Sequence, residues 1–513
     1  MCRVMTPDTV TAQVAAQVRA QVGEAVARYE RALGANDLDL LDELFLDGPS
    51  TVRADATGVL VGHAAISAFR RGRGGAPARD VVALHVVVVS ADAATAVAQT
   101  LRPDGTRGLQ TQTWVRTADG WRVAAAHVSS DARSTVAGAT WRVHGAPLVR
   151  GSGAGPLAGV RVAVKDLIAV AGHAVGGGNP VYLAEQPVQP AHAPAVAALL
   201  AAGADVAGIA QTDEFAYSLA GRNVHSGSPV NPAAPGRLTG GSSSGPAAAV
   251  AAGQAELGLG TDTAGSIRVP ASYCGLFGLR PTHGLVDDGG LLPLAPSFDT
   301  VGLLARSGAV LDAAAAVFLP AAPAPTRFLL ATDLLALAGP GVAGVLRAAA
   351  ARWDPEEVEL TTPDEREAWF AGFRTQQAAE AWAQHGAWVA AHPGVIADDV
   401  ADRFAVAAQV TDEQHARARE TVAGMRAALR DRVPPGTVVL MPAASGPAPT
   451  VGSGGAAVEA SRAATLRLTS LASGAGLPAV VVPGGTVDDA PVGLCLLGGA
   501  GADRGLTALV AAP

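Results

Sequence analysis

Lysine is almost absent from this chain, which draws attention to the single one present. The 513 residues include 37 lysines and arginines, and only Lys165 is a lysine. Arginine serves as well on a solvated face, but its guanidinium group does not deprotonate at working pH. A buried lysine can act as a base, because desolvation lowers the pKa of its ammonium group. Lys165 is therefore a candidate base, and a salt-bridge lysine at a strand end is the plainer alternative.

Charged residues are also scarce, and no basic stripe stands out. They make up 16% of the chain, with a net charge of −8, whereas apolar residues make up 49%. The apolar content indicates a globular protein rather than a disordered one. The acidic balance argues against nucleic acid or an anionic membrane surface as the main partner.

Cysteine is rare and follows no pattern of a disulfide framework or a metal site. The three cysteines are far apart, without a C-x-x-C pair, and are Cys2, Cys274 and Cys495. We interpret them as reduced thiols of a cytosolic protein. No His, Asp or Glu cluster has metal-ligand spacing, so we expect neither a metal nor a cofactor.

Long hydrophobic runs are missing as well. No stretch of 18 clean apolar residues occurs, so no transmembrane helix is predicted. The first 20 residues contain neither an apolar core of signal-peptide length nor a cleavage site. We therefore expect a cytoplasmic protein without a membrane partner.

A glycine- and serine-rich stretch at 236–283 contains the most informative residues of the chain. Ser242 and Ser266 lie 24 positions apart, each flanked by glycine, and a run of small residues follows at 246–253. Glycines let the backbone approach a substrate closely, and successive N–H groups in such a turn can form an oxyanion hole. Linkers share this composition, but the interleaved Val, Leu, Ile and Phe residues argue against a linker.

This stretch resembles the amidase signature family of serine hydrolases. The resemblance rests on GGSSSG and GTDTAGSIRVPASYCG, with AVKD around Lys165 ahead of them, and it covers roughly residues 150–513. The motifs GGGNP, DEFAYSLAG and NPAAPGR are most similar to those of the indole-acetamide hydrolase type. Strand and helix patterns alternate over 159–513, which predicts an α/β fold. The resemblance implies a mixed central sheet covered by helices on both faces.

The resemblance also implies a catalytic triad. Ser266 corresponds to the nucleophile, Ser242 to a bridging serine in a cis peptide, and Lys165 to the base. The oxyanion hole would consist of the N–H groups of Thr263, Ala264, Gly265 and Ser266. Residues in supporting roles would be Gly240, Gly241, Ser243, Asp262 and Arg268. We expect Asp262 and Arg268 to form an ion pair that braces the loop.

A Ser-His-Asp triad is the main alternative within serine hydrolases. Four histidines flank the site in sequence: His173, His192, His225 and His283. However, the context of Ser266 is A-G-S-I-R rather than the G-x-S-x-G elbow. We therefore expect structural or pocket roles for these histidines.

The first 135 residues form a separate predicted unit. A helical spacing of valines over 8–34 precedes strand-like runs that begin near Val81, which predicts a small α+β domain. RYERALGANDLDLLDELF, TVRADAT and QTQTWVR resemble AtzH-like domains of the cone-shaped NTF2-like fold. The resemblance implies that Tyr29 and Arg53 bind or act on a substrate. Alternatively, Tyr29 packs in its helix and Arg53 pairs with Asp55.

Glycine and proline are concentrated over 143–159, and we expect a linker at 136–158 between this domain and a catalytic domain at 159–513.

The function implied is an amidase that converts a small linear amide into a carboxylate and ammonia or an amine through an acyl-enzyme. One alternative is a hydrolase of carboxybiuret or allophanate, with the N-terminal domain acting on a related substrate. Others are an amidotransferase subunit and a non-catalytic scaffold. The resemblance suggests a homodimer, although no residue pattern indicates one. Five aromatic residues fit helix packing as easily as a substrate pocket: Trp369, Phe370, Phe373, Trp382 and Trp388.

Overall fold

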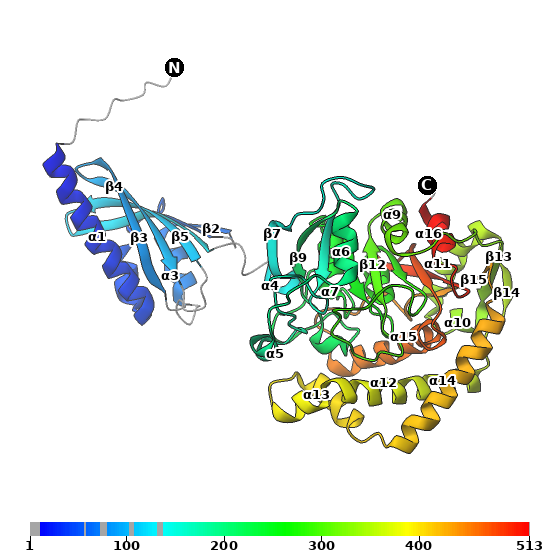
Figure 1. The fold of residues 1–513 in the computed structure, drawn as a ribbon. Helices are drawn as coiled ribbons and strands as arrows, with labels where there is room; N and C mark the ends of the chain where they lie inside the picture. The colour runs from blue at the N-terminus through cyan, green and yellow to red at the C-terminus, as the bar shows by residue number, and fades with distance from the viewer. Residues whose placement is uncertain (1–10, 56–57, 72–78, 102–106, 131–136, 512–513) are drawn as a thin grey trace. The chain divides into compact units, whose positions relative to one another are not determined.

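The structure is a computed structural model that describes residues 11–55, 58–71, 79–101, 107–130 and 137–511 (Figure 1). The chain divides into two compact units, Met1–Val136 and Ala137–Pro513. Each unit has its own hydrophobic core and is described by itself.

The described part of the first unit contains a six-stranded sheet and three helices. The sheet order is β2-β1-β6-β5-β4-β3, with β1 and β6 parallel and the other pairs antiparallel. Its strands are β1 (Val52–Asp55), β2 (Gly58–Val61), β3 (Asp80–Ser90), β4 (Ala93–Leu101), β5 (Arg107–Thr117) and β6 (Gly120–Ser130). Its helices are α1 (Ala12–Ala35), α2 (Leu38–Leu44) and α3 (His63–Arg71).

The core of this unit lies between α1 and one face of the sheet. Helix α1 buries Val18, Val22, Val26 and Tyr29, a spacing of three to four residues that keeps them on one face. Strand β4 alternates between buried and half-buried residues along its whole length, as expected when one sheet face is covered. The helix predicted from the spacing of valines and the α+β class are confirmed, and residues 8–10 of the predicted helix lie outside the described residues.

The described part of the second unit contains an 11-stranded mixed sheet. Its order is β14-β13-β15-β17-β16-β11-β12-β10-β8-β9-β7. Strands β9, β8 and β10 run parallel to one another, and β12 is antiparallel to β10. The strands are β7 (Trp141–Val149), β8 (Arg161–Lys165), β9 (Asp205–Ala210), β10 (Leu257–Thr261), β11 (Phe277–Arg280), β12 (Val301–Ala305), β13 (Arg327–Ala331), β14 (Glu356–Val358), β15 (Thr437–Pro442), β16 (Ala479–Val487) and β17 (Ala490–Gly498).

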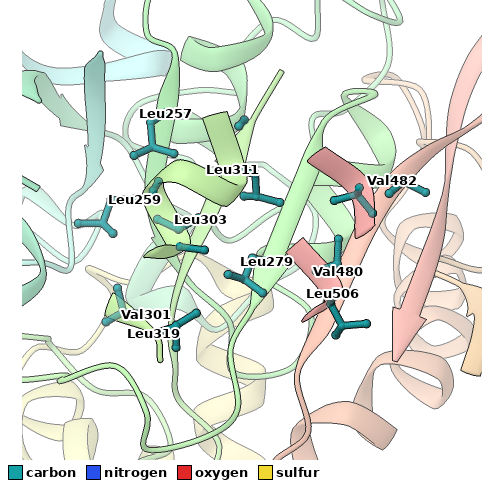
Figure 2. Close-up of a cluster of buried hydrophobic side chains, with 14 of the residues drawn as sticks. Leu257, Leu259, Leu279, Val301, Leu303, Leu311, Leu319, Val480, Val482 and Leu506 are labelled. Atoms are coloured by element: carbon teal, nitrogen blue, oxygen red, sulfur yellow. The ribbon is translucent and has the colours of Figure 1, made fainter. Parts of the chain in front are cut away.

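Helices cover both faces of this sheet. On one face, α6, α9, α11 and α16 pack over the cluster that includes Leu259, Leu303 and Val480 (Figure 2). On the other face, α7, α8, α14 and α15 pack over a second buried cluster. The helices are α4 (Ala137–Thr140), α5 (Pro180–Glu185), α6 (Pro194–Ala201), α7 (Ser244–Ala251), α8 (Arg268–Tyr273), α9 (Gly308–Phe318), α10 (Thr332–Leu335), α11 (Pro340–Ala350), α12 (Pro363–Ala391), α13 (Asp398–Ala407), α14 (Asp412–Arg432), α15 (Gly455–Ala475) and α16 (Asp503–Ala511). The predicted fold class is confirmed.

The three helices α12, α13 and α14 form a layer along one side of this unit (Figure 1). Both long helices begin with a capping box, in which Thr362 and Thr411 each accept from the N–H three residues later. In the part of the chain that the structure describes, none of the helices combines the length and apolar character that crossing a membrane requires.

The structure differs from the prediction at 136–158, where we expected a linker. Residues Trp141–Val149 form strand β7, which pairs antiparallel with β9 and closes one edge of the large sheet. An edge strand tolerates proline and glycine because one side of it needs no ladder hydrogen bonds. The pairing register indeed shifts between His144 and Val149, around Gly145 and Pro147. Glycine and proline content therefore misidentified an edge strand as a linker.

Candidate active site

Lys165 lies at the end of the buried strand β8, where it contacts Ser242 and Thr261. The apolar run before it makes β8 a strand buried on both faces. Strand β10 runs parallel beside it and ends at Thr261, so both carboxyl ends open on the same edge. Lys165 is fully buried, and its Nζ donates to Ser242 Oγ at 2.8 Å and to Thr261 Oγ1 at 2.8 Å.

Ser242 connects Lys165 to Ser266. Ser242 Oγ donates to Ser266 Oγ at 3.0 Å, and both side chains are buried. The Gly241–Ser242 peptide bond is cis. The backbone of the next residue, Ser243, donates to the carbonyl of Ser266 at 3.3 Å, which holds the two serine segments together. Three residues that are 77 and 24 positions apart therefore form one hydrogen-bonded chain.

The surroundings of Lys165 favour its neutral form. Burial lowers the pKa of Lys165 from 10.5 to about 7, although the charges of Asp213, Asp262 and Asp299 oppose the change. A lysine with this pKa is about half deprotonated near neutral pH, and it can then accept a proton.

Asp213 is a site residue that the sequence analysis missed. Its buried carboxylate accepts from Gly221 N–H at 2.9 Å and from Ser244 Oγ at 3.0 Å. A Cβ atom on Gly241 would overlap this carboxylate, so glycine is required where the backbone passes over Asp213. Asp213 also adds negative charge near Lys165. The only signal for it was its place at the start of DEFAYSLAG.

Asp262 organises the loop that precedes Ser266. It lies 2.8 Å from Arg268 and 3.1 Å from Arg280, and all three side chains are buried. Burial raises the pKa of Asp262, but the two arginines and several hydrogen bonds outweigh it and keep the carboxyl ionised. Arg268 also donates to the carbonyl of Thr469 at 2.7 Å and to Ser473 Oγ at 2.9 Å. The Asp262–Arg268 ion pair therefore anchors the loop to α15. Arg280 is a further partner of Asp262 that the sequence analysis did not predict.

Of the four N–H groups expected to form the oxyanion hole, three are free of protein acceptors in the described residues, and that of Gly265 is not. Gly265 N–H donates to Asp262 Oδ1 at 2.9 Å, so it points into the brace rather than toward a substrate. Among the residues that the structure describes, the N–H groups of Thr263, Ala264 and Ser266 have no protein acceptor. Three unpaired donors beside Ser266 suit a developing negative charge.

The remaining supporting residues fix the backbone around Ser242. Gly240 has a φ of 70°, and a Cβ atom there would come within 2.9 Å of the Tyr273 ring. Ser243 Oγ bonds to the backbone of Thr261, accepting from its N–H at 3.3 Å and donating to its carbonyl at 3.2 Å. The segment before α7 is therefore fastened to the end of β10.

Three of the four flanking histidines bond to other residues, and the fourth, His173, is half-buried. His192 Nδ1 accepts from Ala171 N–H, His225 contacts Glu214, and His283 contacts the carbonyl of Pro296. Within the described ranges, no imidazole forms a hydrogen bond with Ser242 or Ser266. This arrangement gives no support to a histidine-based triad.

Asp166, next to Lys165, belongs to a second brace. It lies 2.8 Å from Arg142 Nε on β7, and it accepts from Gly176 N–H at 2.9 Å. Burial raises the pKa of Asp166 to about 6, although Arg142 lowers it. Strand β7 thus supplies a cation to the loop that follows Lys165.

In the first unit, Tyr29 and Arg53 both have protein partners. Tyr29 is buried, and its hydroxyl lies 3.5 Å from Arg70 Nη2. Arg53 donates to Asp55 at 2.8 Å and lies over the ring of Phe69. The ion pair between Arg53 and Asp55 is the one expected if Arg53 has a structural role instead of binding a substrate.

The five aromatic residues mostly pack between helices. Trp369 joins the cluster on one sheet face, and Trp382 and Trp388 pack around Phe215. Phe370 and Phe373 share a cluster with Ala264, and Phe373 lies 4.5 Å from Phe298 between ring centroids. These two therefore pack against the donor loop as well as within the helix layer.

Two family models match the chain. The model described as Amidase matches residues 125–322, and the model described as AtzH-like matches residues 12–134.

Curated relatives and solved structures agree with the family models. "Amidase 1" of Arabidopsis thaliana is 34% identical over 391 residues, which cover 69% of this chain and 92% of that protein. "1-carboxybiuret hydrolase subunit AtzE" of Pseudomonas sp. (strain ADP) is 46% identical over 160 residues, or 31% of this chain and 34% of that protein. A solved "vestigial protein complex" connected with an s-triazine catabolic enzyme is 30% identical with a TM-score of 0.62, covering 70% of this chain and 83% of that chain.

Proposed function

The chain belongs to the amidase family, with an AtzH-like domain at its N-terminus, and from this premise we propose how it hydrolyses an amide C–N bond. The substrate is a small linear amide, and the products are a carboxylate and ammonia or an amine. Ser266 is the nucleophile, Ser242 relays protons, and Lys165 is the base.

One observation carries this proposal: the unbroken hydrogen-bonded chain from Lys165 through Ser242 to Ser266. The two links measure 2.8 and 3.0 Å, which is within reach for proton transfer. The pKa of Lys165, lowered by burial to about 7, supplies a neutral base at the end of the chain. A serine needs such a base because its hydroxyl is a weak nucleophile at neutral pH.

The first half of the reaction forms the acyl-enzyme. As Ser266 Oγ attacks the carbonyl carbon, its proton moves to Ser242 Oγ, and the proton of Ser242 moves to Lys165 Nζ. The N–H groups of Thr263, Ala264 and Ser266 stabilise the negative charge on the former carbonyl oxygen. The C–N bond then breaks as Ser242 passes a proton to the leaving nitrogen and regains one from Lys165.

The second half releases the acid. Water attacks the ester carbon and gives up its proton through the same relay, the C–O bond to Ser266 breaks, and Ser266 Oγ is reprotonated. All groups return to their starting protonation states. The motifs GGGNP at 176–180 and DEFAYSLAG at 213–221 resemble those of indole-acetamide hydrolases. They favour a primary amide of the indole-acetamide type as substrate, in which the leaving group is ammonia.

The AtzH-like domain favours a second candidate function. The likeness to a 1-carboxybiuret hydrolase subunit over 160 residues supports a urea-derivative substrate of the carboxybiuret or allophanate kind. In that case the first unit acts on a related compound through Tyr29 and Arg53. A ligand carboxylate would then have to displace Asp55 from Arg53.

The test is ammonia release from a panel of amides by the wild type and by Ser266→Ala. The panel contains benzamide, indole-acetamide, malonamide, biuret and allophanate. We expect release from at least one amide and none above background from the variant; the preferred amide identifies the substrate class. Absence of release by the wild type would favour an amidotransferase subunit or a scaffold. Release that persists in Ser266→Ala would contradict the nucleophile and direct attention to Tyr29 and Arg53.

We propose two further properties, which concern the location and the assembly of the protein. The residue composition favours a cytoplasmic location, and the family resemblance favours a homodimer. Fractionation of cells that produce the chain and light scattering of the purified protein measure these properties directly. A monomer in solution would overturn the second.

A further inference from the structure

A narrow cleft in the second unit is lined in part by a buried arginine. Six of its lining residues define what we call the Arg462 cleft: Leu219, Val269, Tyr273, Ser461, Arg462 and Thr465. Its lining combines the apolar side chains of Leu219 and Val269 with polar side chains. Helix α15 places Ser461, Arg462 and Thr465 along one side.

Two apolar residues of the Arg462 cleft are hydrogen-bonded to the segments that carry the serines. The carbonyl of Leu219 accepts from Gly241 N–H at 2.9 Å, and Gly241 immediately precedes Ser242. Val269 N–H donates to the carbonyl of Gly265 at 2.8 Å, and Gly265 immediately precedes Ser266. Two lining residues are therefore hydrogen-bonded to the residues that precede the serines, although neither serine lines the cleft itself. Leu219, Val269 and Tyr273 also share a buried cluster with Ala264, one of the three N–H donors beside Ser266.

Arg462 has more hydrogen-bonding capacity than its protein partners use. Its Nη1 donates to Glu459 Oε1 at 3.0 Å. Its Nε is buried and has no partner. A guanidinium group offers five donors in a planar fork that matches a carboxylate, and a buried donor without a partner is costly. The side chain is 10% exposed, so water reaches little of it.

The charges around Arg462 are arranged with cations inside and anions outside. Arg403 is 17% exposed and shares Glu459 with Arg462, whereas Glu459 is 50% exposed. Asp399, the other acid on Arg403, is 62% exposed. Solvent screens exposed carboxylates, so they compensate the buried guanidinium groups incompletely. Accordingly, burial and the neighbouring Arg403 lower the pKa of Arg462, although arginine stays charged at working pH.

We propose that Arg462 is a specificity-determining residue that binds a carboxylate on the acyl part of the substrate. This inference rests on the proposed function, because hydrolysis of a primary amide releases only ammonia, and the rest of the substrate is then the acyl part. The substrate class is a short amide that carries a carboxylate at the far end of an apolar spacer. Glu459 occupies one donor of Arg462 in the free protein and moves outward when the substrate carboxylate binds.

The experiment compares acidic and neutral amides of matched length on the full chain. Ammonia release gives kcat/KM for malonamic, succinamic and glutaramic acids and for the corresponding diamides, and the acid-to-diamide ratio is the readout. We expect a ratio well above 1 at one chain length in the wild type. Arg462→Gln should lower that ratio roughly 10- to 100-fold, because a hydrogen bond to a charged group is lost. Arg462→Lys should retain part of it, because a point charge replaces the fork.

Arg417→Gln is the matched control. Arg417 also pairs with a glutamate on its own helix, but it is 71% exposed and lies outside the Arg462 cleft. Its substitution should leave the ratio unchanged. An unchanged ratio in folded Arg462→Gln, checked by its melting temperature, would overturn the proposal, as would a wild type that prefers the diamides at every length.

A binding measurement separates this inference from the proposed function. Calorimetry of Ser266→Ala with malonate, succinate and glutarate needs no turnover, and we expect Arg462→Gln in that background to weaken binding roughly tenfold or more. If the wild type hydrolyses no amide but the arginine-dependent binding appears, the proposed function fails and the subsite stands. If amides are hydrolysed and binding is independent of Arg462, the subsite fails alone.

Discussion

At the scale of single residues, Lys165 depends on its surroundings for its chemistry. Ser242 and Thr261 fix its ammonium group, and burial lowers its pKa to about 7 against the pull of three carboxylates. Its importance could be predicted because it is the only lysine of the chain. Thr261 and Asp213 could not be predicted, because threonine and aspartate are common and only strand register and a folded loop bring them to the site.

The lowered pKa predicts a rising pH profile. Lys165 must be neutral to accept a proton, so kcat/KM should rise about tenfold per pH unit below pH 7 and level off above it. Initial rates from pH 5 to 9 measure this profile. A flat or falling profile in that range would contradict the role of Lys165.

Lys165→Arg is the companion variant. It keeps the positive charge but cannot provide a neutral base, and we expect a loss of at least about 10³-fold in kcat at every pH.

Gly265 predicts a second effect at the residue scale. Its φ of 123° lies in a region that residues with a Cβ rarely adopt, and a Cβ would come within 3.0 Å of Thr469. Gly265→Ala should therefore lower stability by roughly 1–3 kcal/mol and also lower kcat. Gly424→Ala, in open space on α14, is the control and should stabilise by up to about 1 kcal/mol. Equal melting temperatures for Gly265→Ala and wild type would contradict the strain argument.

At the scale of elements, strand β7 shows where reading the sequence failed. Glycine and proline indicated a linker, but β9 needed a partner on its open edge, and Trp141–Val149 supplies it. No local pattern contains that information, because the pairing joins segments about 60 residues apart. By contrast, β8 and β10 are short apolar runs that end in polar residues, a local pattern that is consistent with buried strands.

At the same scale, we expect Arg142→Gln on β7 to lower the stability of the protein. Without Arg142, the buried carboxylate of Asp166 loses its counter-charge, and the free energy of unfolding should fall by up to roughly 3–5 kcal/mol. Arg161→Gln removes a more exposed pair with Glu256 and should cost at most about 1 kcal/mol.

The sign of the pH dependence follows from the raised pKa of Asp166, which is about 6 in the folded protein and 3.8 ordinarily. The folded state binds more protons than the unfolded state between these values, so stability from this group falls as pH rises through that window. Loss of Arg142 raises the folded pKa further and extends the fall above pH 6. Denaturant titrations should therefore show a larger deficit for Arg142→Gln at pH 8 than at pH 5. An equal deficit at both values would contradict this account.

At the scale of the whole molecule, two units with separate cores make up one chain. Among the described residues, the buried core of the first unit spans 18 to 126, and the buried clusters of the second unit begin at 141. This division could be predicted, since a valine-spaced helix and alternating strands precede a long α/β pattern. The function of the first unit could not, because Tyr29 and Arg53 have protein partners as well as a family resemblance.

The separate cores predict separate unfolding. Leu44→Ala should destabilise the first unit by about 2–5 kcal/mol, because Leu44 is 1% exposed. Calorimetry should then show one transition moved to lower temperature and another unchanged. Amide hydrolysis below the shifted transition should persist. A single transition that moves as a whole would show that the two units unfold together.

The most direct test of the central claim is to locate the nucleophile by mass spectrometry. A fluorophosphonate reacts with an activated serine by forming an O–P bond and releasing fluoride, and peptide mapping then identifies the labelled residue. We predict one adduct, on Ser266, that is absent in Ser266→Ala and forms much more slowly in Lys165→Arg. Labelling of another residue, or labelling of Ser266 at an unchanged rate without Lys165, would contradict the account.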